Sequence, residues 1–97
     1  MTNYETLVSI FEYENKPLQN KEIYQKFIDN GHPKSISSIT TMLSVFKKQK
    51  KLYIWKIRGM PSFFVLPSWI NAQTNELKFG FDPYTKKRTD EPKDNSI

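Results

Sequence analysis

The sequence has 97 residues, 37% of them hydrophobic, and a formal net charge of +5, which suits one domain with a modest core. The absence of cysteine and the single histidine exclude disulfides, thiolate metal sites and ligation by a histidine cluster. No apolar run approaches the roughly 18 residues of a membrane span, and the N-terminus does not resemble a signal peptide. We therefore expect a cytoplasmic protein without membrane association.

The first amphipathic segment predicts a helix from about Asn3 to Tyr13. Thr2 and Glu5 have the spacing of a capping box, in which a hydroxyl cap and a glutamate three residues later exchange hydrogen bonds. The apolar positions then follow at intervals of three and four residues: Tyr4, Leu7, Val8 and Phe11. This face is expected to lie in the core.

A second helix is expected over Lys21–Asp29, with Asn20 as its cap and Gly31 as its left-handed stop. Residues 16–19 before it contain a proline, so this segment should be extended and is a candidate for a minor first strand. The short connection to the next helix favours a steep crossing, as in a helix-turn-helix. His32 in that connection is expected near solvent, with a phosphate contact as the alternative.

The third helix is expected over Ser35–Lys51. Its apolar stripe consists of Ile36, Ile39, Met42, Leu43 and Phe46. The opposite side carries the hydroxyl row, which we define as Ser37, Thr41 and Ser44 with Lys48 at its end. Serine and threonine are mediocre helix formers, so helix propensity does not explain this row. It favours a surface that contacts another molecule; the alternative is a solvated helix face on a small α+β core.

Two apolar segments, 52–57 and 62–66, predict an antiparallel hairpin around the turn 58–61, which contains a glycine. Neither segment alternates between apolar and polar residues, so both faces of the hairpin need cover. The helices should cover one face. The other should be covered by Trp69–Ile70 and the residues after them, or by a second subunit.

The excess positive charge lies in residues 47–66, which we call the basic stretch. It contains no acidic residue and six basic ones: Lys47, Lys48, Lys50, Lys51, Lys56 and Arg58. Lysines in a last helical turn also complement the helix dipole, which accounts for part of the cluster. A stretch of this kind favours a polyanion such as DNA as the partner.

The end of the chain gives weaker signals. Residues 67–73 are expected to open a short fourth helix capped by Ser68, and residues 77–81 to form an extended piece. The domain is expected to cover residues 1–81, followed by a polar tail at 82–97 that should be disordered in isolation. The triplet Lys86-Lys87-Arg88 in it is expected to be solvated, with a DNA backbone contact as the alternative.

These elements together resemble the winged helix-turn-helix superfamily over about residues 3–70. The likeness is carried by Lys16-Pro17-Leu18, the Gly31 turn, the helix from Ser35 and the strands ending at Leu66. The segment KPLQNKEIYQKFIDNG also resembles the HARE-type winged helix. The resemblance implies an α+β fold with three helices and a C-terminal β-hairpin wing. Such domains commonly bind duplex DNA with the third helix in the major groove, and some bind proteins.

A DNA-binding role assigns two sets of site residues. Base edges would be contacted by Lys34, Ser37, Ser38, Thr40, Thr41 and Ser44. The DNA backbone would be contacted by Lys47, Lys48, Lys56 and Arg58, and by backbone amides at the start of the second helix near Asn20 and Lys21. Because the outward side of the third helix has no Arg, Asn or Gln before Gln49, only modest base specificity is expected. Tyr53 and Trp55 are expected in the core, with stacking on single-stranded bases as the alternative.

We therefore expect a duplex DNA-binding protein, either a small transcriptional regulator or an accessory factor of a mobile element. It is expected to need no cofactor or metal and not to be an enzyme, since the sequence has no catalytic motif. The sequence leaves the oligomeric state open; a homodimer through the open hairpin face or residues 69–81 is one arrangement, which would double the DNA contacts. The alternative function is a protein-interaction module that docks a partner through the aromatic hairpin and the C-terminal segment.

Overall fold

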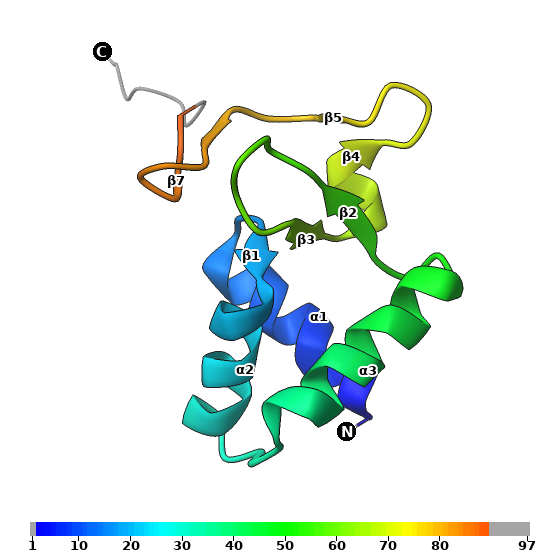
Figure 1. The fold of residues 1–97 in the computed structure, drawn as a ribbon, viewed down its shortest axis with the longest axis vertical. Coiled ribbons are helices and arrows are strands. Elements are labelled where there is room, and N and C mark those ends of the chain that lie inside the picture. The colour runs from blue at the N-terminus through cyan, green and yellow to red at the C-terminus, as the bar shows by residue number, and fades with distance from the viewer. Residues whose placement is uncertain (1, 90–97) are drawn as a thin grey trace.

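In the computed structural model, which describes residues 2–89, three helices pack beside a small sheet, and two further hairpins come after it (Figure 1). The elements are α1 (Asn3–Glu14), β1 (Leu18–Gln19), α2 (Asn20–Asp29), α3 (Ile36–Lys48), β2 (Tyr53–Trp55), β3 (Phe63–Val65), a 3-10 turn (Pro67–Trp69), β4 (Ile70–Asn71), β5 (Glu76–Leu77), β6 (Phe81–Asp82) and β7 (Lys87–Arg88). The expected α+β fold class is confirmed.

Helix α1 begins with the expected capping box. The Glu5 backbone N–H donates to Thr2 Oγ1 at 3.1 Å, and the Thr2 N–H donates to Glu5 Oε1 at 2.8 Å. This second bond is the main reason that the pKa of Glu5 lies below its ordinary value. The helix ends at Asn15, whose φ of 58° lies in the left-handed region.

Helix α2 begins one residue earlier than expected, so Asn20 is not its cap. Gln19 occupies the cap position, and its backbone N–H donates to Glu22 Oε1 at 2.8 Å. Asn20 thus falls within the first helical turn. At the other end Gly31 adopts a φ of 79°, and the His32 N–H donates to Phe27 O at 2.8 Å, which confirms the expected stop.

The three-stranded sheet is antiparallel with the order β1-β3-β2, which confirms the minor first strand. Its register places Phe64 opposite Leu18 on one side and Ile54 on the other. Residues directly opposite one another on paired strands point to the same side of the sheet, so these three share one face. That face meets the helices, since Leu18 is buried in the core and Phe64 packs against it.

One continuous apolar core joins the three helices to this face of the sheet. Its buried members are Leu7, Ile10, Phe11, Leu18, Ile23, Phe27, Ile39, Leu43, Leu52 and Leu66. They come from every helix and from the segments on either side of the hairpin. The packing therefore fixes which side of α3 faces outward.

The other face of the sheet is covered by residues 67–89, which we call the C-terminal segment. The Phe81 ring lies 5.4 Å from Phe63 and 5.8 Å from Trp55 between ring centroids, and Phe63 is fully buried. Trp69 links this layer to the helices, with centroids 5.7 Å from Phe11 and 5.6 Å from Phe79. The chain therefore supplies the cover itself, and the open hairpin face that suggested a homodimer is not open.

The C-terminal segment consists of two hairpins with the same turn geometry. In β4–β5 the Asn71 carboxamide oxygen accepts from the Gln73 N–H, and the N–H of Asn75, at a φ of 61°, donates to Asn71 O at 2.7 Å. In β6–β7 Asp82 accepts from the Tyr84 N–H in the same way, and Lys86 takes the place of Asn75 with a φ of 60°. In both loops the conformation is set by an Asx turn, which Asn71 opens in the first and Asp82 in the second.

Two expectations for this part of the chain are wrong. The short fourth helix is only the 3-10 turn, because Ile70 is already extended and pairs with Leu77. The tail does not begin at Asp82, because Asp82 pairs with Lys87 in the β6–β7 hairpin of residues 81–88. The rest of that expected tail, residues 90–97, lies outside the described residues.

The basic triplet attaches this last hairpin to the helices. The Lys86 ammonium lies 3.6 Å from a Glu22 carboxylate oxygen, and the Lys86 carbonyl accepts from Lys16 Nζ at 3.1 Å. Arg88 donates to Asn15 Oδ1 at 3.0 Å, and its guanidinium lies 4.0 Å from the centroid of a phenylalanine ring, Phe79. Two of the three basic side chains therefore make intramolecular contacts.

Candidate nucleic-acid interface

Helix α3 carries the candidate interface, and its first turn is fixed by Ser35. The Ser35 hydroxyl accepts from the Ser38 N–H at 3.0 Å, as an N-cap does. Ile39 and Leu43 on the opposite side are fully buried. The helix ends at Lys48 rather than at Lys51, because Lys50 turns left-handed with a φ of 60°.

Removing this cap gives a first testable prediction. Ser35→Ala should lower the free energy of unfolding by about 1 kcal/mol, since it leaves an N–H of the first turn without its partner. Ser37→Ala is the matched control and should change it by less than about 0.5 kcal/mol, because the Ser37 side chain is exposed. Urea denaturation measures both, and equal effects of the two substitutions would contradict the assigned cap.

The hydroxyl row lies on the exposed side of α3, as expected. Ser37, Thr41, Ser44 and Lys48 are all exposed. Within residues 2–89 the three hydroxyls of this row make no hydrogen bond to the protein, so their donors and acceptors face solvent. They are available to an external partner.

Two other hydroxyls of the expected base-contact set are engaged within the protein. The Thr40 hydroxyl donates to Ile36 O at 2.9 Å and accepts from Asn20 Nδ2 at 3.0 Å. The Ser38 hydroxyl accepts from Ser35 Oγ at 3.1 Å. Thr40 therefore joins α3 to α2, and Ser38 belongs to the cap.

Of the two residues expected to contact DNA at the start of α2, one is exposed and the other is bonded within the protein. Lys21 is exposed, whereas Asn20 directs its amide toward Thr40 and its Oδ1 is buried. Asn20 thus orients the two helices, and its side chain is not placed for a phosphate contact. Lys34, in the connection before α3, is partly buried.

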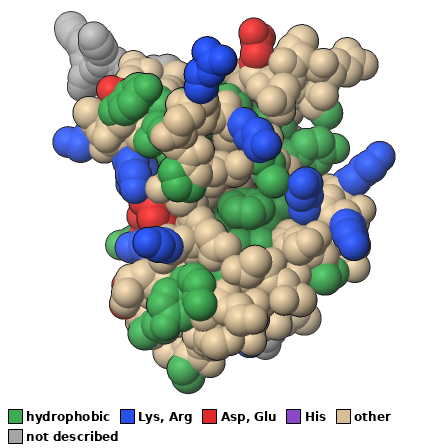
Figure 2. Space-filling view, in the orientation of Figure 1, with side chains coloured by type: hydrophobic (Ala, Val, Ile, Leu, Met, Phe, Trp, Pro, Cys, Tyr) green, Lys and Arg blue, Asp and Glu red, His purple; other side chains and the backbone are tan. Residues whose placement is uncertain are grey.

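The basic stretch overlaps the end of the hydroxyl row at Lys48 and continues after it along the sequence. All six of its basic residues are exposed, and none forms an ion pair within the described residues. Figure 2 shows Lys and Arg side chains gathered on the side where α3 ends, with no acidic side chain among them. The sequence has no Asp or Glu between Asp29 and Glu76, so the electrostatic potential over α3 and the hairpin is positive.

The turn 58–61 presents Arg58 to solvent. Gly59 has a φ of 81°, and the Met60 N–H donates to Ile57 O at 3.1 Å. From the neighbouring strand, Gln19 Nε2 donates to the Pro61 carbonyl at 3.1 Å. The turn is therefore held at both sides while its arginine is exposed to a partner.

The aromatic residues of β2 belong to the packing of the protein. The Trp55 ring lies 5.7 Å from Phe63 as well as against Phe81, and Tyr53 is partly buried. A ring that already contacts two others offers little free surface to a base. The geometry favours the core assignment over stacking on single strands.

Two apolar residues of α3 depart from the expected pattern. Ile36, expected in the buried stripe, is 45% exposed, because it begins the helix beyond the reach of the core. Val45, which the sequence did not single out, is 43% exposed. Its position four residues after Thr41 was the signal that marked it as outward-facing.

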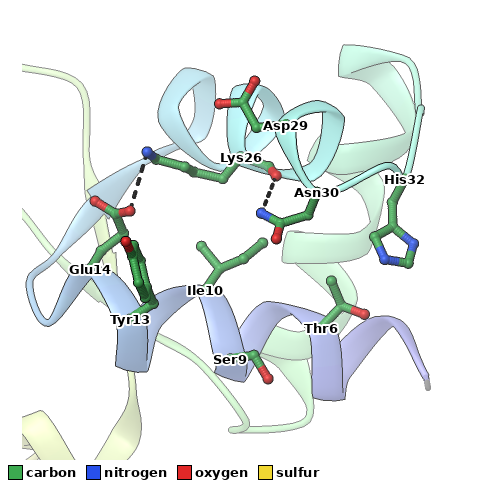
Figure 3. Close-up of a pocket in the computed structure, with 9 residues that line it drawn as sticks. All are labelled: Thr6, Ser9, Ile10, Tyr13, Glu14, Lys26, Asp29, Asn30 and His32. Carbon is green, nitrogen blue, oxygen red and sulfur yellow. Dashed lines mark hydrogen bonds and ion pairs between the residues drawn. The ribbon is translucent and has the colours of Figure 1, made fainter.

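A separate groove of about 650 Å³ lies between α1 and α2 (Figure 3). Two of its charged groups pair with each other, since Lys26 Nζ lies 3.2 Å from Glu14 Oε2, and this contact raises the pKa of Lys26 above its ordinary value. Asp29 accepts from Gln25, and His32 is exposed with its ring against Phe27. Within the described residues Asp29 has no ion pair, so the groove presents a single unpaired carboxylate and does not suit a polyanion.

The described residues hold no group of three or more His, Asp or Glu side chains that would suit a metal ion. None of the helices in residues 2–89 is long and apolar enough to cross a membrane. No family model, curated protein or solved structure matches this chain. We therefore infer its function from the geometry of α3 and the hairpin.

Proposed function

We propose that this chain is a winged helix-turn-helix protein that binds duplex DNA. Its role would be that of a small transcriptional regulator or an accessory factor of a mobile element. The order helix, strand, two helices and two strands, with β1 paired to β3, supports this fold. In the proposed complex α3 lies in the major groove, and the turn 58–61 lies on the backbone or in the minor groove.

The observation that carries the proposal is the basic stretch beside the hydroxyl row. The stretch exposes six basic side chains that have no ion pair in the described residues. The phosphates of a DNA backbone would neutralise their positive charge. A face whose only purpose was solubility would be expected to mix both signs of charge. A basic face without acidic residues suits DNA binding better.

Phosphate contacts and base contacts would make different contributions to binding. Lys47, Lys48, Lys56 and Arg58 would hold phosphates and so provide most of the affinity. Ser37, Thr41 and Ser44 would meet base edges, where hydroxyls donate or accept and discriminate bases less sharply than arginine or asparagine. Binding should thus be strongly salt-dependent and modestly sequence-specific.

The alternative, a protein-interaction module, loses much of its expected surface. The aromatic side of the hairpin is covered by the C-terminal segment, beneath which Phe63 is fully buried. What remains for a protein partner is the same basic face, or scattered exposed residues such as Tyr13 and Tyr84. Single exposed aromatics of this kind are common on protein surfaces.

The direct experiment is fluorescence anisotropy of a labelled random duplex titrated with the protein at low salt, beside a labelled single strand of the same length. Preferential binding to the duplex is expected. Preference for the single strand would contradict the role of α3 and favour stacking on Tyr53 and Trp55 instead. No binding to either form would contradict DNA binding altogether.

A further inference from the structure

We propose that α3 favours duplexes that carry thymine methyl groups in the major groove. The inference rests on the proposed function and specifies what that interface recognises. It starts from the apolar part of the outward side of α3, which a purely phosphate-binding helix would not need. Its elements are a threonine methyl, an exposed valine and a hollow between them and α1.

The hollow has a volume of about 450 Å³ and lies along one ridge of the helix. Ser37, Thr41 and Val45 succeed one another at intervals of four residues along this ridge, and all three line the hollow. Asn3, at the start of α1, closes it on one side. Two of the three ridge residues therefore present methyl groups to whatever lies against α3.

Partly buried side chains form the rest of its wall. Met42 and Phe46 line the hollow and pack against the core, so the exposed methyls continue an apolar surface that extends into the protein. The Phe46 ring is held by Tyr4, with centroids 5.1 Å apart. This support fixes the ridge and leaves Val45 at 43% exposure.

The charge around the ridge identifies the occupant. Lys47 and Lys48 come after Val45 within the same helix, are exposed, and have no ion pair in the described residues. An apolar protein surface would leave these charges without partners, whereas a duplex brings phosphates to them and base edges to the ridge. Duplex DNA satisfies both the charged and the apolar parts.

Among the four bases only thymine offers a methyl group in the major groove. The hydroxyl row has no arginine, asparagine or glutamine with which to recognise guanine or adenine by paired hydrogen bonds. Burying one methyl group against Thr41 or Val45 should improve affinity about fourfold. Two such contacts should reach about fifteenfold.

The test compares three short duplexes of equal length and charge. The first contains only A·T pairs in irregular order, the second has every thymine replaced by deoxyuridine, and the third contains only G·C pairs. Anisotropy titration should give about fourfold to fifteenfold weaker binding to the deoxyuridine duplex than to the thymine duplex. The G·C duplex, which also lacks the methyl, should bind comparably weakly.

Variants locate the effect on the ridge. Thr41→Ser together with Val45→Ala removes the methyl contacts and keeps both the hydroxyl and the helix, so affinity for the two A·T-type duplexes should become equal. Thr85→Ser is the matched control, because it removes a threonine methyl from an exposed side chain of the C-terminal segment, outside the proposed interface, and it should retain the preference. Circular dichroism confirms that each variant is folded.

The outcomes separate this proposal from the proposed function on which it rests. Equal binding of thymine and deoxyuridine duplexes by the unmodified protein would overturn methyl recognition and leave DNA binding intact. A preference that survives in the Thr41→Ser and Val45→Ala variant would also overturn it, since the methyl would then act elsewhere or through DNA shape. Binding to none of the three duplexes would instead contradict the proposed function.

Discussion

Replacing Phe81 with alanine is expected to lower the free energy of unfolding by about 3 kcal/mol. The Phe81 side chain is 9% exposed and lies against Phe63 and Trp55, so its removal opens a cavity beneath the C-terminal segment. A domain of this size has a total stability of about 5–10 kcal/mol, so the loss should be plain in a urea denaturation curve.

The matched control lies in the same hairpin. Tyr84 is 76% exposed, and Tyr84→Ala should change the free energy of unfolding by less than about 0.5 kcal/mol. If Phe81→Ala changed the free energy of unfolding as little as Tyr84→Ala, residues 67–89 would not be part of the folded domain. The covered face of the sheet would then be open, and a homodimer through that face would again be one arrangement.

Reversing the charges beside the turn 58–61 is expected to weaken duplex binding at least tenfold. Lys56→Glu with Arg58→Glu removes two exposed positive charges from the basic stretch and puts two negative ones in their place. Neither side chain has an ion pair in the described residues, so the fold should be unaffected. Anisotropy at a fixed salt concentration measures the change.

An equal change of net charge elsewhere provides the control. Lys78→Glu with Lys87→Glu alters two exposed lysines of the C-terminal segment, outside the proposed interface. The duplex affinity of this variant should fall by less than about threefold. Both lysines lie outside the proposed interface, and salt screens charges that are not in contact with the DNA. Equal losses from the two double variants would show that only net charge matters and would contradict a defined role for the turn.

The helices and the hairpin were predictable because their signals are local. The capping box at Thr2, the glycine stop at Gly31 and the three-and-four spacing of apolar residues each act within one or two turns. The helix bounds were wrong by one residue at the end of α1 and at the start of α2, and by three residues at the end of α3. The capping bond of Gln19 with Glu22 sets the start of α2, and the left-handed turn at Lys50 sets the end of α3.

The C-terminal segment was not predictable in the same way. Its strands have two residues each, too few to show alternation, and the polar sequence around Lys86 and Arg88 resembles a solvated tail. The order comes from long-range contacts with Glu22 and Asn15, which no local pattern reports. The repeated Asx turn was the one signal that the sequence offered.

The sequence predicted which side of α3 faces outward, but not which of its hydroxyls are bonded within the protein. The helical period placed Ser37, Thr41 and Ser44 outward correctly. It could not show that Thr40 is bonded to Asn20, because that contact joins two helices whose rotation about each other is set by the core. The exposure of Val45 does follow the helical period, because Val45 lies four residues after Thr41, although its apolar side chain drew no prediction.

The central claim is that exposed basic side chains around α3 bind the phosphates of a duplex. The most direct measurement is the dependence of the duplex association constant on salt concentration. With about four to six phosphates engaged, log K should fall against log salt with a slope of roughly −4 to −5. A slope near zero, or no duplex binding at low salt, would contradict this claim.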